Sequence, residues 1–297
     1  MHPTPSITRR HFIQVCAAVG FSAASAHATP SNKEKGWQIG CFTRPWSEFE
    51  VETIFDAISK AGFHYVGLMS AAPDSQLIIS LSTKEERAVR IGSEAKSRGL
   101  GILSNFAGDF GVQQSKQSGI DNLRRLIDLS VACGSKSLLL GGTEKSELFD
   151  AYYHAVANCC DEAMKKGIQL TLKPHGGLNS TGPECRKIIE RVGHRNFRLW
   201  YDPGNIFYYS NGQLDPVQDA ESVNGIVTGM CVKDYQHPED VEITPGTGKV
   251  NFPEVISRLK KGGFKSGPLL IECLKKGDLE SLQREAIRAR QSLESWL

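Results

Sequence analysis

Short apolar segments alternate along the chain with longer segments in which apolar residues recur at the spacing of an α-helix. Alternation of this kind is typical of βαβ units around a parallel sheet. The predicted strands are residues 37–42, 65–68, 101–104, 137–140, 169–172, 197–201, 226–232 and 269–272. The predicted helices are residues 51–61, 83–98, 118–132, 149–166, 182–192, 216–223, 251–261 and 279–297.

Local signals support several of these helix boundaries. Thr181-Gly182-Pro183-Glu184 has the form of a capping box, and Asn251-Phe252-Pro253-Glu254 places Pro in a first turn. Lys60-Ala61-Gly62 and Lys261-Gly262 put basic residues and then Gly at helix ends. No GxGxxG follows the first strand, which argues against an open dinucleotide-binding sheet. The sequence therefore predicts a single-domain α/β fold over residues 37–297, a (β/α)₈ TIM barrel.

The first 28 residues do not fit this pattern. Thr8-Arg9-Arg10-His11-Phe12-Ile13 is a twin-arginine sequence, an apolar stretch runs to residue 24, and Ala26-His27-Ala28 resembles a cleavage site. An amphipathic first helix is the alternative, but an uncharged run after an Arg pair argues against it. We expect a Tat signal peptide over residues 1–28, a linker over 29–36 and a periplasmic or otherwise exported protein.

The balance of charge limits the classes of partner. Loss of residues 1–28 removes Arg9 and Arg10, and the formal net charge of +2 falls to zero. A neutral chain is a poor candidate for nucleic-acid binding, which needs a basic face. No other segment is long and apolar enough to suggest a membrane span. Seven of the eight cysteines would remain, so at least one cannot pair within the chain, and we expect most to be small core residues.

Function in a TIM barrel gathers where the strands end, so the residues at these ends are the candidates. Alternation along the fifth strand points Thr171 and Lys173 into the barrel and leaves His175 at the rim. An inward Lys is expensive unless a carboxylate pairs with it. His175 is either a hydrogen-bonded rim residue or a ligand or acid–base group.

The next three strands also end in polar groups. Asp202 precedes Pro-Gly and is either a turn former or a functional carboxylate. Cys231 and Lys233 lie on one face of the seventh strand. In the simplest interpretation Cys231 is a small apolar core residue and Lys233 forms an ion pair with a neighbouring carboxylate. Glu272 ends the apolar eighth strand, and it is either a salt-bridge partner or a functional carboxylate. Two carboxylates, an imidazole and two amines from adjacent strands could hold a polyol and move protons.

Further candidates for substrate binding lie close to the strand ends. Arg44 follows the first strand and could bind an anionic group or pair at the surface, and Asn205 follows the sixth. Aromatic side chains near the strand ends could form a platform for a sugar ring, or could be ordinary loop packing. They are Phe42, Trp46, Phe106, Phe110, Tyr208 and Tyr209.

Three segments in the second half of the chain resemble the xylose-isomerase-like barrel family of sugar phosphate isomerases and epimerases. They are Tyr201-Asp202-Pro203-Gly204-Asn205, Val232-Lys233-Asp234, and Gly246-Thr247-Gly248-Lys249-Val250-Asn251-Phe252 leading to Gly267-Pro268-Leu269-Leu270-Ile271-Glu272. The resemblance implies a divalent metal held by Glu, Asp, His and Glu from strands five to eight, which orients two sugar oxygens. Asp202 and Glu272 match two of these positions, but Lys173 stands at the first Glu and Cys231 at the His.

These departures leave two hypotheses for the site. In the first, His175, Asp202 and Glu272 bind Mn²⁺ or Zn²⁺, with Cys231 as a further ligand. In the second, the site is metal-free and Lys173 pairs with Asp202 and Glu272. Lys173 could then bind sugar oxygens, act as a general base if its pKa is depressed, or form a Schiff base.

The resemblance implies an enzyme that moves a proton next to a carbonyl, as in isomerisation, epimerisation or elimination on a sugar or keto-sugar derivative. Lys173, His175 and Glu272 would be catalytic, and Lys233, Asn205, Arg44 and Trp46 would bind the small carbohydrate. A barrel that binds sugars without turnover is the alternative, because two metal ligands are replaced. An AP-endonuclease-like phosphodiesterase shares the barrel but needs a His-rich site, which this sequence lacks.

Overall fold

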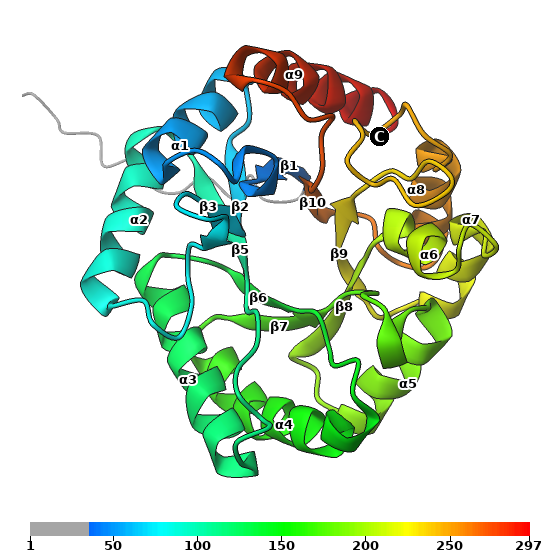
Figure 1. Cartoon of the computed structure of the whole chain (residues 1–297). Helices are drawn as coiled ribbons and strands as arrows, with labels where there is room; N and C mark the ends of the chain where they lie inside the picture. The colour runs from blue at the N-terminus through cyan, green and yellow to red at the C-terminus, as the bar shows by residue number, and fades with distance from the viewer. Residues whose placement is uncertain (1–35) are drawn as a thin grey trace, which may run out of the picture. The chain divides into compact units, whose positions relative to one another are not determined.

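Eight parallel strands form a closed barrel in the computed structural model, which describes residues 36–297. Around the barrel the strands follow the order β1-β10-β9-β8-β7-β6-β5-β2, and a ring of helices surrounds them (Figure 1). The strands are β1 Trp37–Phe42, β2 Tyr65–Leu68, β5 Gly101–Phe106, β6 Ser137–Leu140, β7 Gln169–Leu172, β8 Phe197–Tyr201, β9 Val227–Val232 and β10 Gly267–Ile271. The predicted TIM barrel is confirmed. The predicted signal peptide and most of the linker lie outside the described residues.

The helices are connected to the strands in regular βα order. They are α1 Val51–Lys60, α2 Glu85–Ser97, α3 Lys116–Ala132, α4 Phe149–Lys165, α5 Gly182–Val192, α6 Pro203–Tyr209, α7 Pro216–Asp219, α8 Phe252–Lys261 and α9 Leu279–Ser295. Within residues 36–297 the order is completed by four 3₁₀ turns and a short two-stranded ribbon. The turns are Arg44–Trp46, Ser146–Leu148, Gly177–Asn179 and Ala220–Val223, and the ribbon pairs β3 Ser70–Ala71 with β4 Gln76–Leu77. Across residues 36–297, none of the helices combines the length and the apolar character that a membrane span would need.

Several helix starts follow the expected capping chemistry. Thr181 and Glu184 form the predicted capping box at α5, and Asn251 caps α8 by accepting from the Glu254 amide. Helix α6 was not predicted, because Asp202-Pro203-Gly204 was interpreted as a turn. Asp202 instead caps α6, and Pro203 takes its first position.

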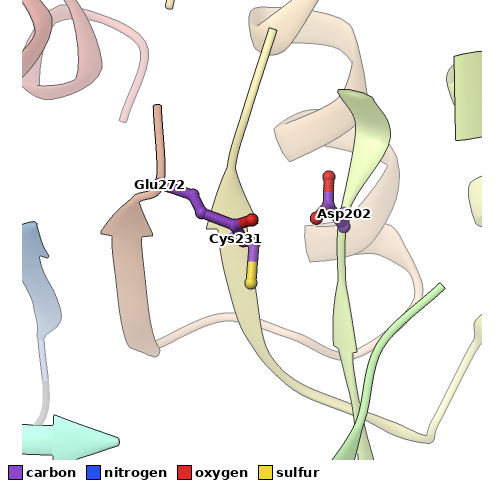
Figure 2. Close-up of side chains that lie close together, drawn as sticks. All are labelled: Asp202, Cys231 and Glu272. Atoms are coloured by element: carbon purple, nitrogen blue, oxygen red, sulfur yellow. The ribbon is translucent and has the colours of Figure 1, made fainter. Parts of the chain in front are cut away.

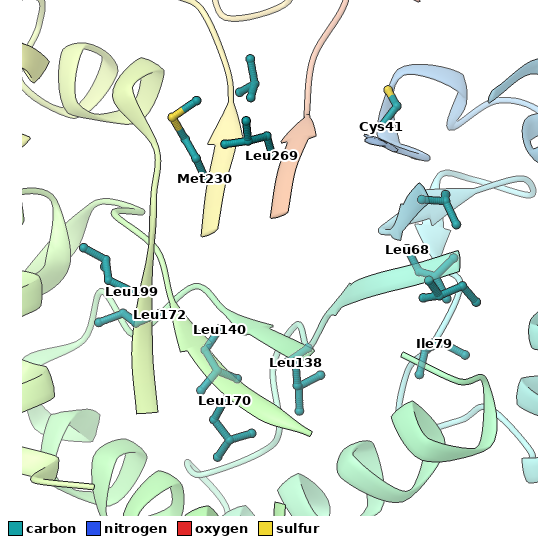
Figure 3. Close-up of a cluster of buried hydrophobic side chains, with 14 of the residues drawn as sticks. Cys41, Leu68, Ile79, Leu138, Leu140, Leu170, Leu172, Leu199, Met230 and Leu269 are labelled. Carbon is teal, nitrogen blue, oxygen red and sulfur yellow. The ribbon is translucent and has the colours of Figure 1, made fainter. Parts of the chain in front are cut away.

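Two apolar layers hold the barrel together. The outer layer fills the space between the strands and the helices, and Figure 3 draws part of it, including Leu138, Leu170 and Leu199. The inner layer lies inside the barrel and consists of Phe42, Met69, Leu103, Leu139, Trp200, Cys231 and Leu270. The seven cysteines of the described chain are all buried and free, as expected for small core residues.

Candidate functional site

Charged side chains of alternating sign follow five neighbouring strands at their carboxyl ends. In barrel order these strands are β7, β8, β9, β10 and β1. The charged residues that follow them are Lys173, Asp202, Lys233, Glu272 and Arg44, respectively. Neighbouring strands lie about 4.8 Å apart, so each carboxylate is placed within reach of a cation on either side.

Lys173 lies between the two carboxylates of this cluster. Its Nζ donates to Glu272 Oε2 at 2.6 Å and lies 2.8 Å from Asp202 Oδ2. The Lys173 and Asp202 side chains are fully buried. Burial alone would lower the pKa of Lys173, but the charges of Asp202 and Glu272 outweigh it and raise that pKa well above its usual value. Lys173 is therefore an ammonium ion, which argues against the general-base and Schiff-base roles considered from the sequence.

Glu272 forms ion pairs with three cations. Besides Lys173, Lys233 Nζ lies 2.5 Å from Glu272 Oε1, and Arg44 Nη1 donates to the same oxygen at 3.2 Å. Burial would raise the pKa of Glu272, but Lys173, Lys233 and Arg44 together hold it well below its usual value. Both of its oxygens are therefore occupied, and the carboxylate is permanently charged near neutral pH.

Asp202 has two separate tasks. Its Oδ1 accepts from the Asn205 amide at 3.0 Å and caps α6, while its Oδ2 faces Lys173 and lies 3.6 Å from Lys233 Nζ. Asn205 is also buried, and its side chain accepts from Lys233 at 3.0 Å and donates to the Pro174 carbonyl at 2.6 Å. Asp202 therefore caps a helix and takes part in the ion-pair cluster, and Asn205 orients Lys233.

A metal ion does not fit this arrangement. Asp202, Cys231 and Glu272 offer ligand atoms that all lie within 4.8 Å of one another, from the ends of β8, β9 and β10 (Figure 2). Lys173 Nζ, however, stands between the two carboxylates at ion-pair distance and donates no lone pair while it is charged. Burial also raises the pKa of the Cys231 thiol well above its usual value. His175 is not part of this group, so the three ligand atoms that lie together differ from the His175, Asp202 and Glu272 set expected from the sequence.

His175 lies instead on the wall of a neighbouring cavity of about 430 Å³. The cavity is lined by Phe106 at the end of β5 and by residues of the loops after β5, β6 and β7, among them Asp109, Gln113, Thr143, Glu144, Lys145 and His175. The imidazole packs between Phe106 and Tyr209, with ring centroids 5.9 and 6.0 Å away, and has no hydrogen-bond partner within residues 36–297. Burial, then the charges of Lys173 and Lys233, lowers the pKa of His175 to about 3. The ring is therefore neutral.

The expected aromatic platform is only partly present. Phe106 lines the cavity and Tyr209 flanks His175. Trp46, Phe42 and Phe110 are fully buried, so for these three the alternative of ordinary packing holds, and none of them offers a face to a sugar. Their apolar rings contribute more to stability by packing inside the core than they would beside a solvated cavity.

Two acidic residues at the site were missed from the sequence. Glu242 pairs with Arg44, whose Nη1 also donates to Cys273 Sγ at 2.8 Å. Glu242 lies in the long segment between β9 and α8, where no sequence pattern fixes its position. Asp234 belongs to the Val232-Lys233-Asp234 motif, but no role of its own was predicted for it. It is buried, and its carboxylate accepts hydrogen bonds from backbone amides of the same segment. Its position directly after the inward-pointing Lys233 could have indicated that Asp234 is buried near the site.

Comparison with known proteins agrees with this architecture. The chain is 23% identical over 159 residues to uncharacterized protein MJ1311 of Methanocaldococcus jannaschii, across 51% of this chain and 50% of that protein, so it spans about half the length of this curated relative. Among solved structures it is similar to D-psicose 3-epimerase from Clostridium cellulolyticum H10 with D-tagatose, at 13% identity, 87% of this chain, 98% of the other and a TM-score of 0.68. It is also similar to a xylose isomerase-like TIM barrel protein from Mycobacterium smegmatis in complex with magnesium, at 17% identity, coverages of 88% and 98% and a TM-score of 0.69.

Identities this low show a shared fold and carry no residue roles across. The family model for xylose isomerase-like TIM barrels matches most of the sequence, from residue 55 to residue 295. That span runs from the first helix of the barrel to the end of its last helix. The chain belongs to the xylose isomerase-like TIM barrel family.

Proposed function

We propose that this protein acts on a sugar or keto-sugar derivative by moving a proton next to a carbonyl, in the cavity beside His175. The observation that carries the proposal is a neutral imidazole with free ring nitrogens on a cavity wall, backed by two buried ammonium groups. A volume of about 430 Å³ falls within the range of small-molecule sites. The loops after β5, β6 and β7 are also where TIM barrels keep their active sites.

The charges around His175 act on both ends of this proton transfer: Lys173 and Lys233 make the ring a weaker base, but they also favour negative charge on a bound substrate. A neutral imidazole can accept a proton from a carbon next to a carbonyl. Negative charge then develops on the carbonyl oxygen, and the buried charges of Lys173 and Lys233 stabilise it electrostatically. The same negative charge would raise the pKa of His175, so proton uptake by the ring and charge development on the sugar favour each other.

The relatives support the class of substrate. The similar structure named as a D-psicose 3-epimerase was solved with D-tagatose, and ketose epimerisation needs a proton transfer of this kind. Ketohexoses are therefore the first substrates to test.

The test is exchange of substrate protons in D₂O, followed by NMR on D-tagatose, D-psicose and keto-glycosides. We expect exchange by the unaltered protein and a loss of about 100-fold or more with His175→Gln, as for removal of a general base. His154→Gln, in an exposed position on α4, is the matched control and should keep full activity. Exchange that survives His175→Gln would contradict the proposal.

One observation favours a second candidate, a barrel that binds sugars without turnover. Both carboxylates of the cluster are buried and engaged by cations, so neither is free to shuttle a proton. A thermal-shift screen separates the candidates: a sugar that raises the melting temperature but shows no exchange and no product identifies a binder.

We also propose that the protein is exported through the Tat pathway. The support is the sequence of residues 1–28, in which a twin-arginine pair, an apolar stretch and Ala26-His27-Ala28 follow in order. N-terminal sequencing of protein from the periplasm should start near Thr29. An intact N-terminus on protein that stays in the cytoplasm would contradict export.

A further inference from the structure

The strongest unexplained feature is the position of the Lys173 nitrogen. Ligand oxygens lie about 2.0–2.2 Å from Zn²⁺ and at similar distances from Mg²⁺, so an ion shared by Asp202 and Glu272 would stand between them. Lys173 Nζ occupies that place, 2.8 Å from Asp202 Oδ2 and 2.6 Å from Glu272 Oε2. A metal ion and this ammonium cannot share the space.

The charges of the cluster also balance without a metal ion. Asp202 and Glu272 bring two negative charges into a region that water does not reach. Lys173 and Lys233 bring two positive charges, the amount that a divalent ion would supply. Arg44 and Glu242 form a further pair at the edge of the cluster. Burial of uncompensated carboxylates is strongly unfavourable, so the two lysines meet a need that an ion would otherwise meet.

We propose that the Lys173 ammonium is a tethered cation that replaces a divalent metal at this site, and that the protein folds stably without any metal. Asp202, Cys231 and Glu272 are then a latent metal site, closed only by the side chain that fills it. The inference rests on charge and geometry within the cluster and holds whether or not the protein turns over a sugar.

The first measurement uses the unaltered protein. Elemental analysis should find well below one Mg, Mn, Zn or Co ion per chain. Its melting temperature should not change with EDTA or with millimolar Mg²⁺, Mn²⁺ or Co²⁺. A stoichiometric ion in the purified protein, or a clear loss of melting temperature in EDTA, would overturn the proposal.

The second measurement removes the tethered charge. Lys173→Gln leaves two carboxylates, a thiol and an amide oxygen around the vacated space. We expect Co²⁺ to raise the melting temperature of this variant by several degrees and to give the absorption of thiolate-bound cobalt. The absorption should disappear in the Lys173→Gln/Cys231→Ala double variant.

Lys166→Gln, at a surface ion pair with Asp128 and Glu162, is the control and should gain no affinity for Co²⁺. A Lys173→Gln chain that folds only when Co²⁺ is present would also support the proposal. A Lys173→Gln chain that neither binds Co²⁺ nor is recovered by it would overturn the proposal, since the ammonium would not be holding the place of an ion.

Discussion

Lys173 donates to Glu272 at 2.6 Å across 99 residues of sequence, and both side chains are buried. The contact joins the end of β7 to the end of β10, with β8 and β9 between them. A buried ion pair of this kind persists only where further charges and hydrogen bonds complete it. Asp202, Lys233 and Arg44 do so here.

Removal of the Lys173 charge should destabilise the fold strongly. In Lys173→Met, two buried carboxylates lose their shared cation, and breaking a buried pair in this way costs about 3–5 kcal/mol. Urea denaturation followed by circular dichroism measures the loss.

Lys166→Met is the matched control for this change, because Lys166 also bridges two carboxylates but at the surface. We expect a loss of no more than about 1 kcal/mol there. Similar losses in the two variants would show that burial of the Lys173 cluster adds nothing.

The stability of the protein should depend on pH through His175. The folded-state pKa of about 3 lies below the ordinary value of 6.5, so between these values the unfolded chain binds more protons than the folded one. The free energy of unfolding should therefore fall as the pH drops from 6.5 towards 3. The slope from this one group reaches about 1.4 kcal/mol per pH unit.

His175→Gln isolates this contribution from that of Glu272, whose lowered pKa acts in the same direction below pH 4.5. Lys173, Lys233 and Arg44, the other charges facing His175, keep their charge throughout this range. Urea titrations between pH 6 and pH 5 should show a shallower slope in the variant than in the unaltered protein. Equal slopes would mean that His175 titrates normally.

The interior of the barrel should not accept an added methyl group at Gly67. A Cβ there would lie 2.3 Å from Phe42 Cδ1 and 2.7 Å from Leu270 Cδ1. Because protein interiors are close-packed, Gly67→Ala should cost about 1–3 kcal/mol. Gly36→Ala, where nothing lies within 4 Å of the new Cβ, should leave the melting temperature unchanged.

Much of the barrel could be predicted from the sequence because its strands are short apolar runs with clear breaks. The predicted bounds of β1, β2, β6, β7 and β8 agree with the structure. Helix α6 was missed because Asp, Pro and Gly serve both turns and helix starts, and only the tertiary position of Asp202 separates the two. The β3–β4 ribbon was missed because two-residue strands carry no periodic signal.

The charged cluster was predictable in part, since strand alternation points Lys173 inward and the barrel brings Asp202 and Glu272 beside it. That His175 stands apart from Asp202 and Glu272 was not, because β7 ends at Leu172 and alternation no longer applies three residues further on. Trp46 was misjudged because proximity to a strand end does not decide between core and cavity. The position of Glu242 could not be predicted, because no sequence pattern fixes the conformation of a long loop.

The conformation of the loop that contains Glu242 should depend on Asp234. The buried Asp234 carboxylate accepts from the backbone amides of Tyr235, Gly246, Gly248 and Val250, at 2.8, 2.9, 2.8 and 3.0 Å. In Asp234→Asn an NH₂ group replaces one oxygen and faces amides that can only donate. Loss of hydrogen bonds to a charged group costs about 1.5–3 kcal/mol each, so this change should loosen the loop.

Hydrogen–deuterium exchange followed by mass spectrometry should show faster exchange at residues 246–250 in Asp234→Asn, and a lower melting temperature. The effect should reach Glu242 and its pairing with Arg44, because Asp234 holds the other end of the same segment. Asp240→Asn is the control, since Asp240 is exposed and its side chain accepts only from the Glu242 amide among the described residues. If residues 246–250 exchange equally fast in both variants, Asp234 does not order the loop that carries Glu242 to the barrel mouth.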